Sequence, residues 1–143
     1  MALIILVSVV LTAFPSSRFT QATPAPSSAI LGEWRGESLC KNLVLAPACK
    51  DETIRYVFTA VKDSPNTFHV VAEKLVNGRF ESMGEFDLDY SSTAHAWQYD
   101  FETRDRMKLR WEYTIEDSVL AGALLVRDSG ERLRKVTASR PKS

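Results

Sequence analysis

The chain has 143 residues with 18 basic and 18 acidic side chains, so its formal net charge is zero. This length is enough for one domain with one core. Because the two signs are interleaved rather than clustered, the composition argues against binding to nucleic acid or to an anionic membrane surface.

An apolar segment opens the chain and covers residues 3–14, ending before Pro15. A membrane-spanning helix needs about 20 apolar residues, so this shorter run favours the central part of a signal peptide. Thr20-Gln21-Ala22 is a suitable small-x-small cleavage site, which predicts that residues 1–22 are removed as a signal peptide. No Lys or Arg precedes the apolar run, and an uncleaved anchor is the alternative.

Cleavage after Ala22 would leave 121 residues with 17 basic and 18 acidic side chains, for a net charge of −1. Residues 23–29 are rich in Pro, Ala and Ser and predict a flexible lead-in, followed by one domain over 30–140. The first cysteine is Cys40, too far from the cleavage region for a lipoprotein anchor. These features predict a secreted or periplasmic protein without a stable membrane anchor after cleavage.

Two cysteines, Cys40 and Cys49, have eight residues between them. In an exported protein, two cysteines at short range predict a disulfide, with free or redox-active thiols or a metal site as the alternatives. A metal site needs more ligands at short spacing, and this loop holds no CxxC pattern and no histidine. We therefore expect a disulfide worth about 2–3 kcal/mol in chain-entropy terms, no metal and no cofactor.

Hydrophobic alternation with a period of two dominates after Ile30, which predicts strands with one face on a core and one in water. No window of comparable length has the spacing of an amphipathic helix. The predicted strands cover 30–40, 51–62, 67–76, 79–90, 95–103, 107–115, 118–127 and 131–139. Residues 119–126 are apolar at both parities, so a strand there is either buried on both faces or wrongly assigned.

Turn residues separate these runs. Pro65 lacks an amide hydrogen, so residues 63–66 are expected to interrupt the strands on either side. Asn77-Gly78 is typical of a type I′ hairpin because both residues tolerate a positive φ. Eight hairpin-linked strands without a helix predict an all-β fold: an antiparallel up-and-down eight-stranded barrel, or a closely related β-sandwich. Closure favours the barrel because it removes exposed strand edges.

No catalytic motif stands out, and we expect a protein that is not an enzyme and has no catalytic residues. His69 and His95, the two histidines, lie inside predicted strands and outside any motif. Asp51 and Glu52 are adjacent and point to opposite faces of a strand, which favours a solvated strand entry or a salt bridge that anchors the cysteine loop. The basic residues over 104–110 are interrupted by an acidic one, which favours a solvated face.

Aromatic residues gather at matching parity on two neighbouring predicted strands: Trp97, Tyr99, Phe101, Trp111 and Tyr113. An eight-stranded barrel is just wide enough to be filled by side chains or to hold one small ligand. Bulky residues favour a filled core. The alternative is a lumen in which Trp97, Tyr99, Trp111 and Tyr113 form aromatic walls, with two phenol hydroxyls that orient a small apolar or aromatic ligand.

Gly32-Glu33-Trp34 begins the first predicted strand. A G-x-W at this position, followed by a strand meander, resembles the lipocalin and avidin group, the calycins. The resemblance covers the layout of residues 30–140. It implies that Trp34 closes one end of the barrel beneath a basic side chain from the last strand, either Arg134 or Arg140. Gly32 would let another part of the chain approach closely.

Two features depart from the calycin pattern. Too few residues follow the eighth predicted strand for a C-terminal helix, which is closer to avidin than to a lipocalin. The Cys40–Cys49 loop is not a general calycin feature and is more similar to small bacterial periplasmic inhibitor barrels with one early disulfide. Two functions are therefore expected: a binder of a small apolar ligand in the lumen, or an extracytoplasmic protein-interaction or hydrolase-inhibitor module that acts through rim loops including this one. An open cavity would favour the first function.

Overall fold

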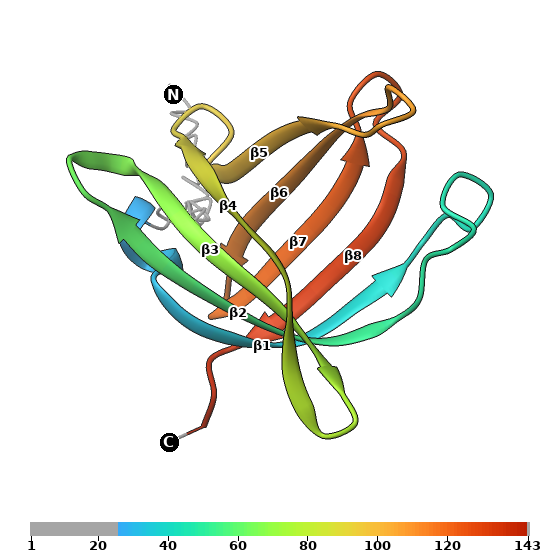
Figure 1. The fold of residues 1–143 in the computed structure, drawn as a ribbon. Helices are drawn as coiled ribbons and strands as arrows, with labels where there is room; N and C mark the ends of the chain where they lie inside the picture. The colour runs from blue at the N-terminus through green and yellow to red at the C-terminus, as the bar shows by residue number, and fades with distance from the viewer. Residues whose placement is uncertain (1–25, 143) are drawn as a thin grey trace, which may run out of the picture.

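Eight antiparallel strands close into a barrel in which each strand pairs with its sequence neighbours and β1 pairs with β8 (Figure 1). The computed structural model describes residues 26–142, so the predicted signal peptide over 1–22 lies outside the described residues. The strands are β1 Gly32–Cys40, β2 Glu52–Val61, β3 Ser64–Val76, β4 Arg79–Ser91, β5 Ala96–Glu102, β6 Lys108–Glu116, β7 Val119–Val126 and β8 Arg132–Ser139. The all-β, up-and-down barrel prediction is confirmed, and the sandwich is excluded. Across residues 26–142, no helix has the length and apolar character to cross a bilayer.

Alternation along each strand fills the interior of the barrel. In β2, for example, Ile54, Tyr56 and Phe58 are buried while their neighbours are partly or fully exposed. The buried residues of all the strands form one cluster, in which Tyr56, Phe58 and Tyr113 meet edge to face. This period-two pattern explains why the sequence predicts the strands within a few residues of their observed bounds.

The start of β3 differs from the prediction. The strand begins at Ser64 rather than after residue 66, so Pro65 lies inside it. Val61 pairs with Ser64, but Ala60, which precedes Val61 in β2, pairs with Phe68. The register shift leaves Pro65 without a strand partner, and a residue that cannot donate an amide hydrogen is tolerated there.

Turn positions otherwise follow the expected chemistry. Asn77 and Gly78 have φ values of 50° and 80°, as the predicted type I′ hairpin requires. His95 was expected in a strand but lies in the turn before β5 with a φ of 50°, because β5 begins one residue later. Residues 119–126 form β7 as predicted, with Leu120 and Gly122 buried in the interior and an outer face that is only partly exposed.

Glycine at position 36 permits the close contact between β1 and β8. A Cβ at this position would lie 1.9 Å from the carbonyl oxygen of Thr137 and 2.6 Å from the Cα of Ala138. No side chain fits in that space, so the ring of strands closes here by direct packing of backbone on backbone.

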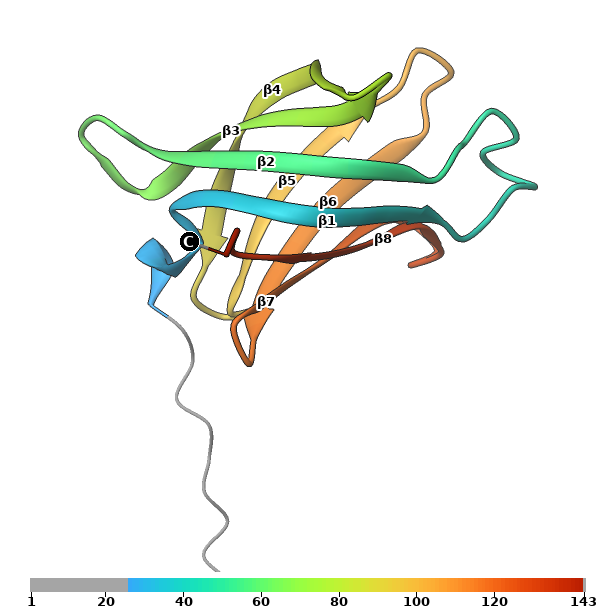
Figure 2. The same cartoon turned by 90° about the horizontal axis from the view of Figure 1, so that it is seen from below.

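A short 3-10 helix, η1 (Ser27–Ile30), covers one end of the barrel, which we call the closed end (Figure 2). Ile30 is fully buried. The Trp34 indole donates to the Ile30 carbonyl (2.8 Å), and the Trp97 indole donates to the Ser27 carbonyl (2.9 Å). Residues 26–29, predicted as part of a flexible lead-in, are thus held by hydrogen bonds and packing; residues 23–25 lie outside the described part.

Arg140 completes the closed end. Its guanidinium carbon lies 3.9 Å from the centroid of the Trp34 ring, and the group donates to the carbonyls of Ala29 and Leu31. Gly32 has a φ of 99°, and an added Cβ would lie 2.8 Å from the Arg140 guanidinium, so Gly32 makes room for this side chain. Of the two basic residues that the sequence offered as a cover, Arg140 therefore stacks on Trp34.

Candidate functional site

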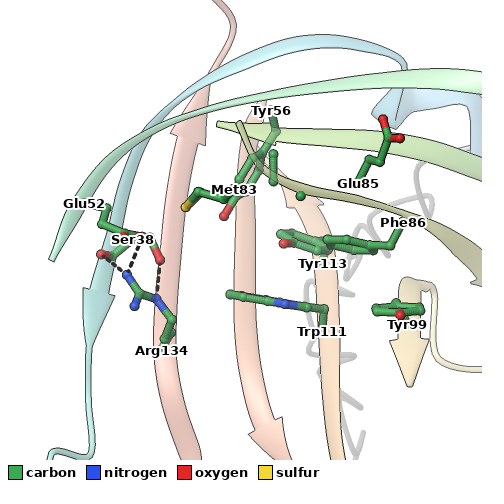
Figure 3. Close-up of a pocket in the computed structure, with 12 residues that line it drawn as sticks. Ser38, Glu52, Tyr56, Met83, Glu85, Phe86, Tyr99, Trp111, Tyr113 and Arg134 are labelled. Atoms are coloured by element: carbon green, nitrogen blue, oxygen red, sulfur yellow. Dashed lines mark hydrogen bonds and ion pairs between the residues drawn. The ribbon is translucent and has the colours of Figure 1, made fainter. Parts of the chain in front are cut away.

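A pocket of about 300 Å³ occupies the other half of the barrel, toward the end that carries the disulfide. Its floor includes Ser38 of β1, Tyr56 of β2 and Tyr113 of β6, which are 1–2% exposed. Ser38, Glu52 and Arg134 cluster at one side of the pocket, and the rings of Phe86, Tyr99, Trp111 and Tyr113 lie at the other, with Glu85 beside them (Figure 3). The complete lining is Ser38, Glu52, Tyr56, Ala72, Met83, Gly84, Glu85, Phe86, Tyr99, Trp111, Tyr113 and Arg134.

The aromatic side of the pocket is made of two stacked pairs on neighbouring strands, since Tyr99 of β5 is the cross-strand partner of Trp111 of β6. The rings of Trp111 and Tyr113 are 5.7 Å apart with an interplanar angle of 14°. Those of Phe86 and Tyr99 are 4.6 Å apart at 21°. Flat rings held in near-parallel planes offer π surfaces to a planar apolar molecule.

Arg134 organises the polar side. Its Nε donates to the hydroxyl of Ser38 (2.8 Å), and its Nη2 donates to the carboxylate of Glu52 (3.1 Å) and to the carbonyl of Lys50 (2.9 Å). Nη1 lies 3.0 Å from the sulfur of Cys49. The guanidinium is thus held between the barrel interior and the disulfide loop, and its charge is balanced by Glu52.

A chain of hydroxyl groups runs from Arg134 into the pocket. The Tyr56 hydroxyl is hydrogen-bonded to those of Ser38 and Tyr113. Burial, the largest cause, raises the pKa of Tyr56 to about 12, and burial also raises the pKa of Tyr113 well above its usual value. Both phenols therefore keep their protons at physiological pH and act as neutral donors or acceptors.

The pocket lies along a seam between β4 and β5. These two strands pair only from Asp89 to Ser91, whereas β3 and β4 pair along almost their whole length. A bulge opposite Ala72 bends β4, and β4 and β5 diverge from their shared turn (Figure 1). Residues 83–86 of β4 and Tyr99 of β5 line the pocket from the two sides of this seam.

Three of the four predicted ligand-binding residues line the pocket: Tyr99, Trp111 and Tyr113. Trp97 does not. It is 1% exposed, packs on Tyr90 and belongs to the closed end through its bond to Ser27. Trp97 shares the parity of Tyr99 but is the second residue of β5, and the start of β5 lies at the closed end.

The polar residues of the pocket were not predicted as a site. Arg134 was offered as a cover for Trp34 but lies near the start of β8, at the opposite end from Arg140, since the five strand residues 135–139 separate them. Ser38, Glu52 and Tyr56 carry no motif and come together only through the pairing of β1 with β2 and β8. The sequence indicates these residues only through their alternation along the strands, which places their side chains on the inner face of the barrel.

The predicted disulfide between Cys40 and Cys49 is confirmed, with an S–S distance of 2.04 Å. The loop that it closes is braced further. Asn42 Oδ1 accepts the amides of Val44 (3.1 Å) and Leu45 (3.0 Å), and the Cys40 amide donates to Asp51 Oδ1 (2.7 Å). Asp51 and Glu52 thus both anchor the loop, Asp51 directly and Glu52 through its pair with Arg134.

The tip of this loop is apolar and exposed. Leu43 and Val44 are 59% and 90% exposed, among the few large apolar side chains of residues 26–142 that face solvent. A braced loop that presents apolar side chains is a feature of interaction surfaces.

The remaining charged groups that the sequence singled out lie on the outer surface. His69 is 2.7 Å from Asp87 and 3.5 Å from Glu85, and its hydrogen bond to Asp87 is the largest cause that raises its pKa. In the basic segment, Arg110 makes a two-bond pair with Asp100. Over residues 26–142, no three His, Cys, Asp or Glu side chains are placed to hold a metal ion.

Comparison of the chain with protein-family models, with curated protein sequences and with solved structures finds no match.

Proposed function

We propose that this protein is an exported, non-enzymatic β-barrel that binds a small apolar or aromatic ligand in its lumen. The observation that carries this proposal is the pocket of about 300 Å³ walled by Tyr99, Trp111 and Tyr113. Its volume is at the lower end of the range of ligand pockets, about 300–1,000 Å³, which suits a ligand of one or two fused rings.

Two features of the barrel support this function. The closed end, with Trp34 beneath Arg140, gives the pocket a rigid base, because three side-chain groups bond the η1 backbone. The seam between β4 and β5 offers a ligand a route through the barrel wall, because only a few backbone hydrogen bonds join these two strands. We also propose a calycin-like origin for this arrangement, on the strength of the Trp34 and Arg140 contact.

Export is part of the proposal. The apolar run over 3–14 and the cleavage site at Ala22 support it. The disulfide between Cys40 and Cys49 is compatible with an oxidising compartment such as the periplasm or the extracellular medium.

Native mass spectrometry of the exported protein tests ligand binding. We expect a retained small molecule that is lost from Ala72→Leu, because Ala72 lines the pocket and a larger side chain would fill it. The matched control is Ala121→Leu. This alanine lies on the outer face of β7 and does not line the pocket, so the same enlargement there should leave the ligand bound. Equal retention by both variants, or none by the parent, would refute lumen binding. The intact mass also tests cleavage, because a chain that still begins at Met1 would contradict it.

A second function, an extracytoplasmic protein-interaction or hydrolase-inhibitor module, is favoured by one observation: Val44 is 90% exposed on a disulfide-braced loop. In this case the loop would enter an apolar pocket of a partner protein. Photo-crosslinking from position 44 tests it, with position 128 in an exposed turn at the same end of the barrel as the control. A product specific to position 44 supports the interaction, and identical patterns from both positions would argue against it.

A further inference from the structure

The wall of the barrel contains a free strand edge at the seam between β4 and β5. β4 pairs with β3 over most of its length, but it pairs with β5 only from Asp89 to Ser91 (Figure 1). Among residues 26–142, positions 84–88 of β4 and 99–102 of β5 therefore have a strand partner on one side only. A free strand edge can accept the backbone of another extended chain.

A groove of about 440 Å³ lies along this edge, and its lining includes the exposed carboxylates of Asp87, Asp89 and Asp100. On the interior side of the seam, the ring of Tyr99 stacks on Phe86 of β4, with centroids 4.6 Å apart. Side chains alternate between the two faces of a strand. A strand added at this edge would therefore have aromatic rings next to one face and carboxylates next to the other.

The β4 side of the seam carries an excess of negative charge. Glu85, Asp87 and Asp89 are exposed at alternate positions, so their side chains share the outer face of β4. His69 lies 2.7 Å from Asp87 and 3.5 Å from Glu85, and Asp89 accepts a hydrogen bond from the Thr67 hydroxyl. The three carboxylates therefore share the single positive charge that His69 carries when it is protonated.

The β5 side of the seam is already neutralised. Asp100 pairs with Arg110 and Arg127, and Glu102 pairs with Arg106. Attraction for a cationic strand is therefore directed to the edge of β4. Opposite charges across paired strands are stabilising, whereas like charges directly opposite are destabilising. This edge therefore favours a basic strand over the same acidic edge of a second copy.

We propose that the free edge of β4 binds an extended peptide segment in which basic and apolar residues alternate, added to the barrel wall as a further β-strand. The backbone of the segment pairs with residues 84–88. Its basic side chains lie opposite Glu85 and Asp87 and diagonal to Asp89. Its apolar side chains face the stacked rings on the interior side of the seam. This interaction surface is separate from the disulfide loop and does not depend on a lumen ligand.

Three acetylated and amidated peptides test the pattern: KVKVKVK, KKVVVKK and EVEVEVE. The second has the composition of the first without its alternation, and the third keeps the alternation with the opposite charge. In calorimetric titration of the purified, disulfide-bonded protein, KVKVKVK is expected to bind about tenfold more tightly than KKVVVKK, because only the alternating peptide places its charges on one face. EVEVEVE is expected not to bind, since its carboxylates would face those of β4.

The triple variant E85Q/D87N/D89N removes the carboxylates of the β4 edge and keeps the size of each side chain. We expect it to bind KVKVKVK about tenfold more weakly than the parent does, the combined effect of three cross-strand charge pairs. The matched control is E116Q/D117N/D128N, which removes three carboxylates from exposed positions outside the groove. Its affinity should stay within about twofold of the parent, because distant surface charges are screened by salt.

Backbone hydrogen exchange gives a reading that charge attraction alone would not change. In NMR spectra of the parent, bound KVKVKVK should slow the exchange of amides within 84–88 that exchange freely in the unbound protein, because an added strand accepts their hydrogen bonds. KKVVVKK should leave these amides unprotected.

Equal affinities for KVKVKVK and KKVVVKK would overturn this inference, as would an unchanged affinity in E85Q/D87N/D89N. Binding without protection of residues 84–88, or no binding of any of the three peptides, would overturn it as well. The proposed function is decided separately by the retained ligand and the Ala72→Leu comparison.

Discussion

Replacing Trp34 by alanine removes the side chain that closes the barrel beneath η1. The ring is 2% exposed, and truncation of a buried tryptophan costs about 3–5 kcal/mol. The change also leaves the Ile30 carbonyl without its indole donor, now at 2.8 Å, which adds about 1 kcal/mol. We expect the free energy of unfolding to fall by about 4–6 kcal/mol, a large part of the roughly 5–15 kcal/mol that stabilises a domain.

Urea unfolding followed by far-UV circular dichroism measures this loss. With a slope of about 1.5 kcal/mol/M, the midpoint should fall by about 3–4 M, or the variant should be unfolded without urea. Arg140→Gln is the milder variant of the same contact, with roughly 0.5–2 kcal/mol expected from the cation over the ring. Trp111→Ala is the matched control, since that ring borders the pocket and should cost less. A Trp34→Ala midpoint equal to that of the parent would refute the reasoning.

Three further changes probe the rest of the barrel. No free thiol should be labelled in the denatured, unreduced protein, and reduction of the Cys40–Cys49 disulfide should lower the free energy of unfolding by about 2–3 kcal/mol; two labelled cysteines would contradict the bond. Gly36→Ala should destabilise by about 1–3 kcal/mol or more, because its Cβ would overlap the β8 backbone, and a neutral urea midpoint would show that the strands separate easily. The raised pKa of His69 means that its pairing with Asp87 stabilises the protein fully below the unfolded pKa of about 6.5. That contribution is lost as pH rises through the higher folded pKa. Because the pair is more than one-third exposed, we expect at most about 1 kcal/mol, with a flatter pH profile for His69→Gln, and an identical profile would rule this out.

The fold could be predicted from sequence because its determinants are local. A period of two along each strand, together with turn residues such as Asn77-Gly78, is enough to indicate hairpin-linked strands. The position of Pro65 inside β3 could not be predicted, since it depends on a register shift against β2. The same is true of η1, because two of the three side chains that bond its carbonyls, Trp97 and Arg140, lie 70 and 111 residues further along the chain.

The candidate site could be predicted only in part. Parity places Tyr99, Trp111 and Tyr113 on the inner face, but it does not say at which end of the barrel an inward residue lies. That position follows from the pairing of all eight strands, which sends Trp97 to the closed end and Arg134 to the disulfide end. The hydroxyl chain has no sequence motif at all, since its three members come from β1, β2 and β6.

The central claim, that the lumen is a ligand site, is tested most directly by the indole N–H resonances of the three tryptophans. Trp111 lines the pocket, whereas Trp34 and Trp97 donate to backbone carbonyls of η1 at the closed end. On titration with 2-acetylnaphthalene, NMR should show a saturating shift of the Trp111 resonance with little change in the other two. An unmoved Trp111 resonance, or equal shifts of all three, would contradict the account.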